Sequence, residues 1–152
     1  MARQLCQTTG EMVTVVNLDG WRGKKLLKEL KFPPGALHIV AKEKPYADYV
    51  REVAQHKLVL QLDCSRVPGQ VAGDALLART VCIGGDGTVE RIAFGETNGE
   101  GRTISDLAKI AANLVADHPA RAAIVLDSQS RAMEHLSFQA IRLQLEEFFA
   151  LL

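Results

Sequence analysis

Three aspartates follow segments whose composition is typical of β-strands. Asp19, Asp63 and Asp127 each come after a run of apolar, largely branched residues. In an open α/β sheet the ligand crevice lies beyond the carboxyl ends of the strands, so parallel neighbouring strands would bring these carboxylates together. Carboxylate oxygens suit Mg²⁺, which in turn orients phosphate. On this interpretation the three aspartates hold the metal, and Asp63 and Asp127 are the catalytic pair.

The same aspartates have an ordinary structural interpretation, which the sequence leaves open. An aspartate after a strand is commonly a turn former or the N-cap of a helix. Asp19 precedes Gly20, a frequent turn pair. Ser65, Arg66 and Ser128 stand beside two of the aspartates and could contact an oxyanion. We therefore include Arg66 among the candidate phosphate-binding residues.

A glycine-rich run in the middle of the chain, residues 84–88, is compatible with two structures. Its sequence is Gly84-Gly85-Asp86-Gly87-Thr88. β-branched and aromatic residues flank it on both sides, as in two strands. Asp-Gly is a common pair in the tight turn of a β-hairpin, because such a turn needs positive φ. We favour a hairpin over residues 79–95.

The alternative structure is a phosphate-binding loop. Residues 84–88 resemble the GGDGT motif of NAD kinases and diacylglycerol kinases, in which the loop follows a strand, opens a helix and contacts nucleotide phosphate. The resemblance implies that all five residues bind phosphate, and exposed backbone N–H groups suit an anion. It covers five of 152 residues. The segment after it, Thr88 to Phe94, has the composition of a strand.

The composition limits the class of protein. A chain of 152 residues with 47% apolar and 24% charged residues is typical of one globular domain, so we expect a single domain over 1–152. Eighteen basic residues balance eighteen acidic ones, which argues against nucleic acid or an anionic membrane as partner. There is no apolar run of spanning length and no hydrophobic signal core, so we expect a cytoplasmic protein.

The cysteines do not indicate a zinc or disulfide framework. Cys6, Cys64 and Cys82 are scattered and odd in number, with no Cys-x-x-Cys spacing. Arg66 could stabilise a thiolate at Cys64. A buried, unreactive cysteine is nevertheless the more common case.

The order of the predicted elements indicates an α/β fold. Strands are expected at 12–16, 37–41, 58–63 and 122–127, helices at 21–30, 46–56, 103–117 and 131–150, and a mobile polar loop at 96–102. Thr103 and Asp106 have the spacing of a capping box. Such alternation predicts a three-layer fold, with a mostly parallel sheet, helices on both faces and one hairpin.

The last helix carries apolar residues on more than one face, and surplus apolar surface often marks an interface. We therefore expect a homo-oligomer that forms through this helix. Two functional hypotheses remain. The first is a small ligand-binding or regulatory module. The second is a Mg²⁺-dependent enzyme that hydrolyses, or transfers phosphoryl groups on, a phosphate-bearing small molecule or nucleotide.

Overall fold

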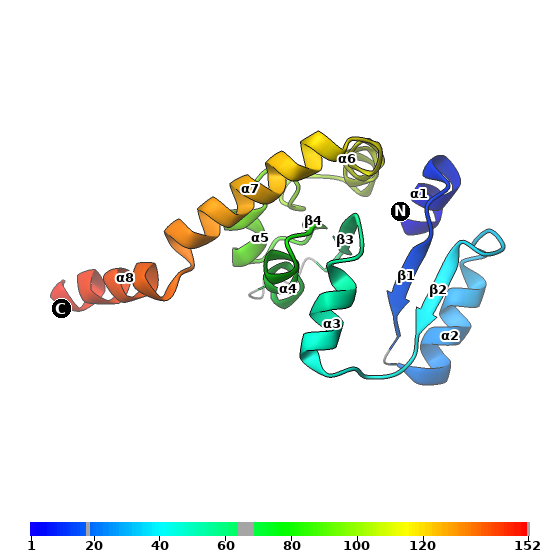
Figure 1. Cartoon of the computed structure of the whole chain (residues 1–152), viewed down its shortest axis with the longest axis horizontal. Coiled ribbons are helices and arrows are strands. Elements are labelled where there is room, and N and C mark those ends of the chain that lie inside the picture. Colours follow the sequence, from blue (N-terminus) through cyan, green and yellow to red (C-terminus); the bar gives the residue numbers. More distant parts are fainter. Residues whose placement is uncertain (18, 64–68, 152) are drawn as a thin grey trace.

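The computed structural model describes residues 1–17, 19–63 and 69–151, and strands and helices alternate along its first half (Figure 1). In chain order the elements are α1 (Ala2–Thr9), β1 (Val13–Val16), α2 (Gly20–Glu29), β2 (Leu37–Val40), α3 (Tyr46–Val53), β3 (Leu58–Gln61), α4 (Gln70–Ala78), β4 (Val81–Gly84), α5 (Thr88–Ala93), α6 (Ile104–Ala116), α7 (His118–His135) and α8 (Phe138–Ala150). No helix in these ranges is long and apolar enough to cross a membrane.

The described strands form two separate parallel pairs. In the first, β1 pairs with β2, from Val13 opposite Leu37 to Val16 opposite Val40. In the second, β3 pairs with β4, from Leu58 opposite Val81 to Gln61 opposite Gly84. A helix connects the strands within each pair, as parallel pairing requires. The mixed α/β class and the parallel pairing are thus confirmed, whereas a single three-layer sheet is not.

Helices cover both faces of the β3–β4 pair. Val81 and Ile83 of β4 point into a cluster with Leu5 of α1 and several residues of α6. Cys82, between them, points to the opposite face, where Phe94 and small residues of α4 and α5 pack. Successive residues of a strand face opposite sides, so this alternation means that β4 is buried on both. All three of these β4 residues are at most 1% exposed.

The β1–β2 pair has a thinner cover. Val40 is buried, whereas Val16 at the end of β1 is 46% exposed and the other β1 residues are half-buried. Gly23 of α2 lies directly against the Asn17 side chain, which donates a hydrogen bond to the Gly20 carbonyl at 3.0 Å. This close approach fixes the start of α2 at the carboxyl end of β1.

The hairpin predicted for residues 79–95 is wrong. β4 pairs in parallel with β3, and the segment after the glycine run is the helix α5, not a returning strand. Val89, Ile92 and Ala93 are spaced three and four apart, which is the helical period. Their β-branched composition favoured a strand, but tertiary packing decides such short segments.

The predictions for the C-terminal third also need correction. Residues 122–127, expected to be a strand, lie inside α7. Asp117 caps this helix by accepting a hydrogen bond from the Ala120 N–H at 2.9 Å, and Pro119 lies in its first turn, where proline is favoured. The single helix expected at 131–150 is divided between α7 and α8, because Ser137 caps a new helix.

Helix capping in the middle of the chain agrees with the sequence. The Thr103 hydroxyl accepts a hydrogen bond from the Asp106 N–H, and the Asp106 carboxylate accepts one from the Thr103 N–H. The predicted capping box at the start of α6 is therefore confirmed. The Thr103 hydroxyl also donates a 2.6 Å hydrogen bond to the Asp106 carboxylate. This bond, followed by the one from the Thr103 N–H, favours the ionised form, so the pKa of Asp106 lies below its usual value.

Candidate functional site

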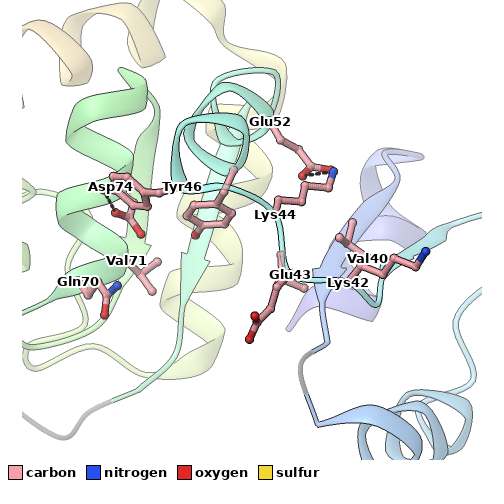
Figure 2. Close-up of a pocket in the computed structure, with 11 residues that line it drawn as sticks. Val40, Lys42, Glu43, Lys44, Tyr46, Glu52, Gln70, Val71 and Asp74 are labelled. Carbon is pink, nitrogen blue, oxygen red and sulfur yellow. Dashed lines mark hydrogen bonds and ion pairs between the residues drawn. The ribbon is translucent and has the colours of Figure 1, made fainter.

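A groove of about 420 Å³ lies where the carboxyl ends of β1 and β2 face α3 and the start of α4 (Figure 2). Val16 and Val40 form one wall and Val71 of α4 contributes to the other. The segment between β2 and α3 crosses the groove, so its side chains line the opening. Carboxyl ends of parallel strands are the usual place for ligand sites in α/β proteins.

A tyrosine–aspartate pair lies inside this groove. Pro45 precedes α3 and makes Tyr46 its first residue. The Tyr46 hydroxyl donates a 2.6 Å hydrogen bond to Asp74 of α4, whose side chain is buried although it is charged (Figure 2). This hydrogen bond raises the pKa of Tyr46, because ionisation would lose the donor next to a carboxylate. The Tyr46 residue itself is 55% exposed.

A second tyrosine, Tyr49, lines the groove beside Tyr46. The rings of Tyr46 and Tyr49 lie 6.4 Å apart between centroids and are tilted by 34°. Burial, followed by the negative charge of Asp74, raises the pKa of Tyr49. Both phenols therefore stay protonated at neutral pH. The Tyr46 hydroxyl already donates its proton to Asp74, so its oxygen can only accept a hydrogen bond from a ligand.

Charges of both signs lie at the mouth of the groove. Lys44 forms a 2.7 Å ion pair with Glu52 of α3, so these two charges compensate each other. Lys42 and Glu43, next to them, form no ion pair within the part of the chain that the structure describes. The mouth therefore offers one cation, Lys42, and one carboxylate, Glu43, that no described residue neutralises.

The glycine run lies in the strand–loop–helix context that the kinase resemblance implies, between β4 and α5. Its glycines are buried, and the segment after α5 covers them. The Gly84 N–H donates to the Thr97 carbonyl at 2.8 Å, and the Gly99 N–H donates to the Gly85 carbonyl. Asp86 is half-buried and Thr88 is exposed. Phosphate binding by residues 84–88 stays a prediction.

Close packing explains why glycine is needed in this loop. Gly84 has φ +88°, and a Cβ there would lie 2.1 Å from the Gln61 carbonyl oxygen of β3. Gly85 has φ +69°, and its Cβ would collide with the Glu90 side chain. Both positions combine a left-handed backbone with a neighbour at contact distance, which only glycine tolerates.

A buried carboxyl group that the sequence did not reveal lies under this loop. Glu90 of α5 is 1% exposed, and its Oε2 has no hydrogen-bond partner among the described residues. Burial raises the pKa of Glu90, and the nearby charges of Asp86 and Asp63 raise it further. An expectation of helix for 88–94 would have placed Glu90 on the inner face with Ala93 and Phe94.

The predicted metal site is not assembled by the fold. Asp19 stands at the start of α2, Asp63 follows β3, and Asp127 lies on α7, where it forms a 2.7 Å ion pair with Arg131. Within residues 1–17, 19–63 and 69–151, no three acidic, histidine or cysteine side chains are placed to hold a metal ion. Asp127 is displaced because its expected strand is a helix.

The other residues considered in the sequence are one arginine, two serines and two cysteines. Arg66, Cys64 and Ser65 lie outside the described residues. Ser128 is buried in α7, where its hydroxyl donates to the Val125 carbonyl at 2.9 Å. Cys82 is a free thiol whose pKa burial raises to about 12, so it is unreactive in the folded chain.

The loop at 96–102 is only partly the solvent-facing segment expected from its polarity, since Glu96, Glu100 and Gly101 are exposed but its other residues are not. Thr97 and Asn98 are buried. The Thr97 hydroxyl donates to the Cys82 carbonyl at 2.6 Å, and the Arg102 guanidinium donates to the Asn98 carbonyl at 2.7 Å. Polar residues serve here as internal hydrogen-bonding groups that fasten the loop to β4.

Comparison with known proteins adds no relative to this description. The chain matches no protein-family model, no curated protein and no solved structure.

Proposed function

We propose that this protein is a small-molecule-binding module, and that its ligand combines a planar, hydrogen-bonding ring with an acidic group, as a nucleotide does. The observation that carries the proposal is the Tyr46–Asp74 pair inside the groove beside β1, β2 and α4. A buried carboxylate and a half-exposed aromatic ring are a combination that ligand sites use for orientation and affinity.

The apolar part of the groove suits a flat ring. The exposed face of Tyr46 offers a stacking surface, and Val16, which is 46% exposed, contributes apolar contact. Aromatic pairs contribute roughly 0.5–1.5 kcal/mol beyond the area that they bury. Covering these two side chains would remove apolar surface from water in a place that already has the shape of a site.

The polar groups of the groove suit the edge of the ring and a charged substituent. Asp74 is an acceptor for ring N–H groups, and Gln70 at the start of α4 can both donate and accept. Lys42, which has no ion pair in the described chain, suits an acidic group such as a phosphate or carboxylate. This separation of a ring site from a cationic site is what selects the proposed class of ligand.

Isothermal titration of the full chain with purine and pyrimidine nucleoside monophosphates, without metal, tests this proposal. Saturation at a hundredfold over the dissociation constant stabilises a protein by about 2.7 kcal/mol, which a thermal-shift assay detects independently. Lys42→Gln should weaken nucleotides but not the corresponding nucleosides. Tyr46→Ala should weaken both. Arg51→Gln, outside the groove lining, is the matched control and should bind normally.

Two outcomes would contradict the proposal. If the wild-type chain is folded by circular dichroism and no nucleotide or aryl phosphate binds at millimolar concentration, the groove is not a site for this class. If nucleotides bind equally well to Lys42→Gln, Tyr46→Ala and the wild type, they bind elsewhere.

A second candidate, a Mg²⁺-dependent enzyme acting on a phosphate ester, is favoured by the unpartnered carboxyl oxygen of Glu90 near Asp63 and Asp86. Mg²⁺ is often bound through one or two carboxylates together with substrate phosphates. This candidate predicts hydrolysis or phosphoryl transfer that requires Mg²⁺ and is lost in Asp63→Asn. Asp127→Asn is the control, because Asp127 lies on α7. Metal-independent binding without turnover would leave only the first proposal.

A further inference from the structure

Helix α8 packs against α7 and extends away from the rest of the chain (Figure 1). None of its described residues is buried. Phe138, Ile141, Leu145 and Phe148 follow one another at spacings of three, four and three residues, and Phe138 is 95% exposed. This spacing places the four side chains on one face, which we call the α8 stripe, and it is the pattern by which two helices pack together.

A second groove, of about 450 Å³, lies at the base of this helix, between α5, α7 and α8. Its apolar lining consists of Ile92, Leu136 and Ile141, and its charged lining includes Arg91 and Arg131. Arg131 Nε is paired with Asp127, and Arg91 has only a 3.9 Å contact with Glu100. We call it the basal groove.

The free end of α8 has the complementary chemistry. Phe148 and Phe149 are more than half exposed, and their rings meet edge to face at 5.5 Å between centroids. Glu146 and Glu147 precede them. An aromatic segment with two glutamates therefore stands at one end of the helix, where Glu146 also has a 3.6 Å contact with Arg142, and a groove with two arginines and an apolar lining lies at the other.

The chain cannot place this end in its own basal groove. Ile141 lines the groove and belongs to the same helix as Phe148, and seven residues of α-helix span roughly 10 Å. The end of α8 is thus held away from the groove by the helix itself. A second copy arranged with its α8 antiparallel would bring its Phe148 to this groove and receive the first copy's Phe148 in return.

We propose that the protein forms a two-fold symmetric homodimer in which the α8 stripes pack antiparallel and each acidic, aromatic end occupies the partner's basal groove. Such an exchange is isologous, so one surface satisfies both copies. The four side chains of the α8 stripe are 42–95% exposed, so antiparallel packing would remove apolar surface from water along the whole face.

Sedimentation equilibrium of the full chain between 1 and 100 µM tests the proposal. The wild type should be dimeric in this range. The double variant Leu145→Lys, Phe148→Lys should be monomeric, with an unchanged circular dichroism spectrum because both side chains are already exposed. Leu126→Lys, at a more exposed residue of α7 outside the stripe and the groove lining, is the control and should remain dimeric.

Charge exchange tests the occupant of the groove. Glu146→Lys with Glu147→Lys should weaken the dimer at least tenfold, and so should Arg91→Glu with Arg131→Glu. A mixture of the two variants should form heterodimers, because one groove contact is then native and the other has both charges reversed. A monomeric wild type at 100 µM would overturn the proposal and leave α8 for a different protein. A dimer that survives the stripe variant would overturn it as well, because its interface would lie elsewhere.

Discussion

The two strand pairs have the same topology and very different surroundings. Each consists of two parallel four-residue strands joined by a helix. β4 is buried on both faces by α1 and α6 on one side and by α4 and α5 on the other. β1 has no fully buried residue, and Val16 at its end is exposed.

The buried strand β4 stabilises the fold, whereas the incompletely covered β1–β2 pair offers surface to a ligand. Strand β4 is buried on both faces, and Thr97 and Asn98 of the loop at 96–102 are turned inward, whereas β3 is only half-buried. The β1–β2 pair leaves apolar surface at its carboxyl ends, and this surface faces α3 and α4 across the groove that holds Tyr46. A surface that is apolar, concave and incompletely covered is where a ligand gains most by binding.

The largest difference in the free energy of unfolding is expected when an isoleucine at the same position of each strand pair is replaced by alanine. Ile83→Ala should lower the free energy of unfolding by about 4 kcal/mol, because Ile83 is fully buried and its removal leaves a cavity. Ile39→Ala, one residue before the end of β2 as Ile83 is in β4, should cost about 1.5 kcal/mol, since Ile39 is only half-buried. Urea unfolding of both variants measures the difference. Equal losses would mean that the two pairs are equally packed.

Alanine in place of two glycines, one against backbone and one against a side chain, is expected to have the next largest effect. Gly84→Ala should cost on the order of 3 kcal/mol, since its φ is positive and the Gln61 carbonyl cannot move without breaking the strand. Gly23→Ala, in the β1–β2 region, should cost at most about 1 kcal/mol. Its obstacle is the end of the Asn17 side chain, which can rotate, and alanine favours the helix.

Thermal melts of the two glycine variants, with Gly73→Ala as control, provide the measurement. Gly73 lies inside α4 with no atom within 4 Å of its added Cβ, so alanine there should stabilise the chain by roughly 0.5–1 kcal/mol. A Gly84→Ala variant as stable as the wild type would show that the loop between β4 and α5 is not closely packed against β3.

The sequence predicts the elements whose signals are local. Apolar runs located β1, β2 and β3, and the Thr103–Asp106 spacing located the start of α6. It fails where a short segment suits two structures. Residues 88–93 are β-branched yet have helical spacing, and only the parallel pairing of β4 with β3 decides between them.

The candidate site could not be predicted from sequence patterns, for a different reason. Tyr46 and Asp74 are 28 residues apart and meet because α3 and α4 pack together. No spacing rule connects such residues. Asp63 and Asp127 were grouped because both followed apolar runs. An apolar run rich in alanine is compatible with a helix as well as a strand, and the run before Asp127 is part of helix α7.

The smallest predicted effect compares two buried carboxyl groups, one under the glycine loop between β4 and α5 and one in the groove. Glu90 lies under the loop with an oxygen that has no hydrogen-bond partner among the described residues, whereas Asp74 in the groove accepts a hydrogen bond from the Tyr46 hydroxyl. Because the pKa of Glu90 is raised above its ordinary value of 4.5, folding favours the protonated acid. The stability that this proton provides is complete below pH 4.5 and is lost as the pH rises through the raised pKa.

Glu90→Gln should therefore stabilise the chain by on the order of 1 kcal/mol at pH 8 and by almost nothing at pH 4, since glutamine resembles the protonated acid. Asp74→Asn should have the opposite sign at pH 8, because it weakens a charge-assisted hydrogen bond. Urea unfolding of both variants at pH 4, 6 and 8 measures the two signs. A Glu90→Gln variant that is less stable than the wild type at pH 8 would mean that the ionised Glu90 carboxylate is stabilised in the folded chain. The folded chain would then stabilise both Glu90 and Asp74 in their ionised forms.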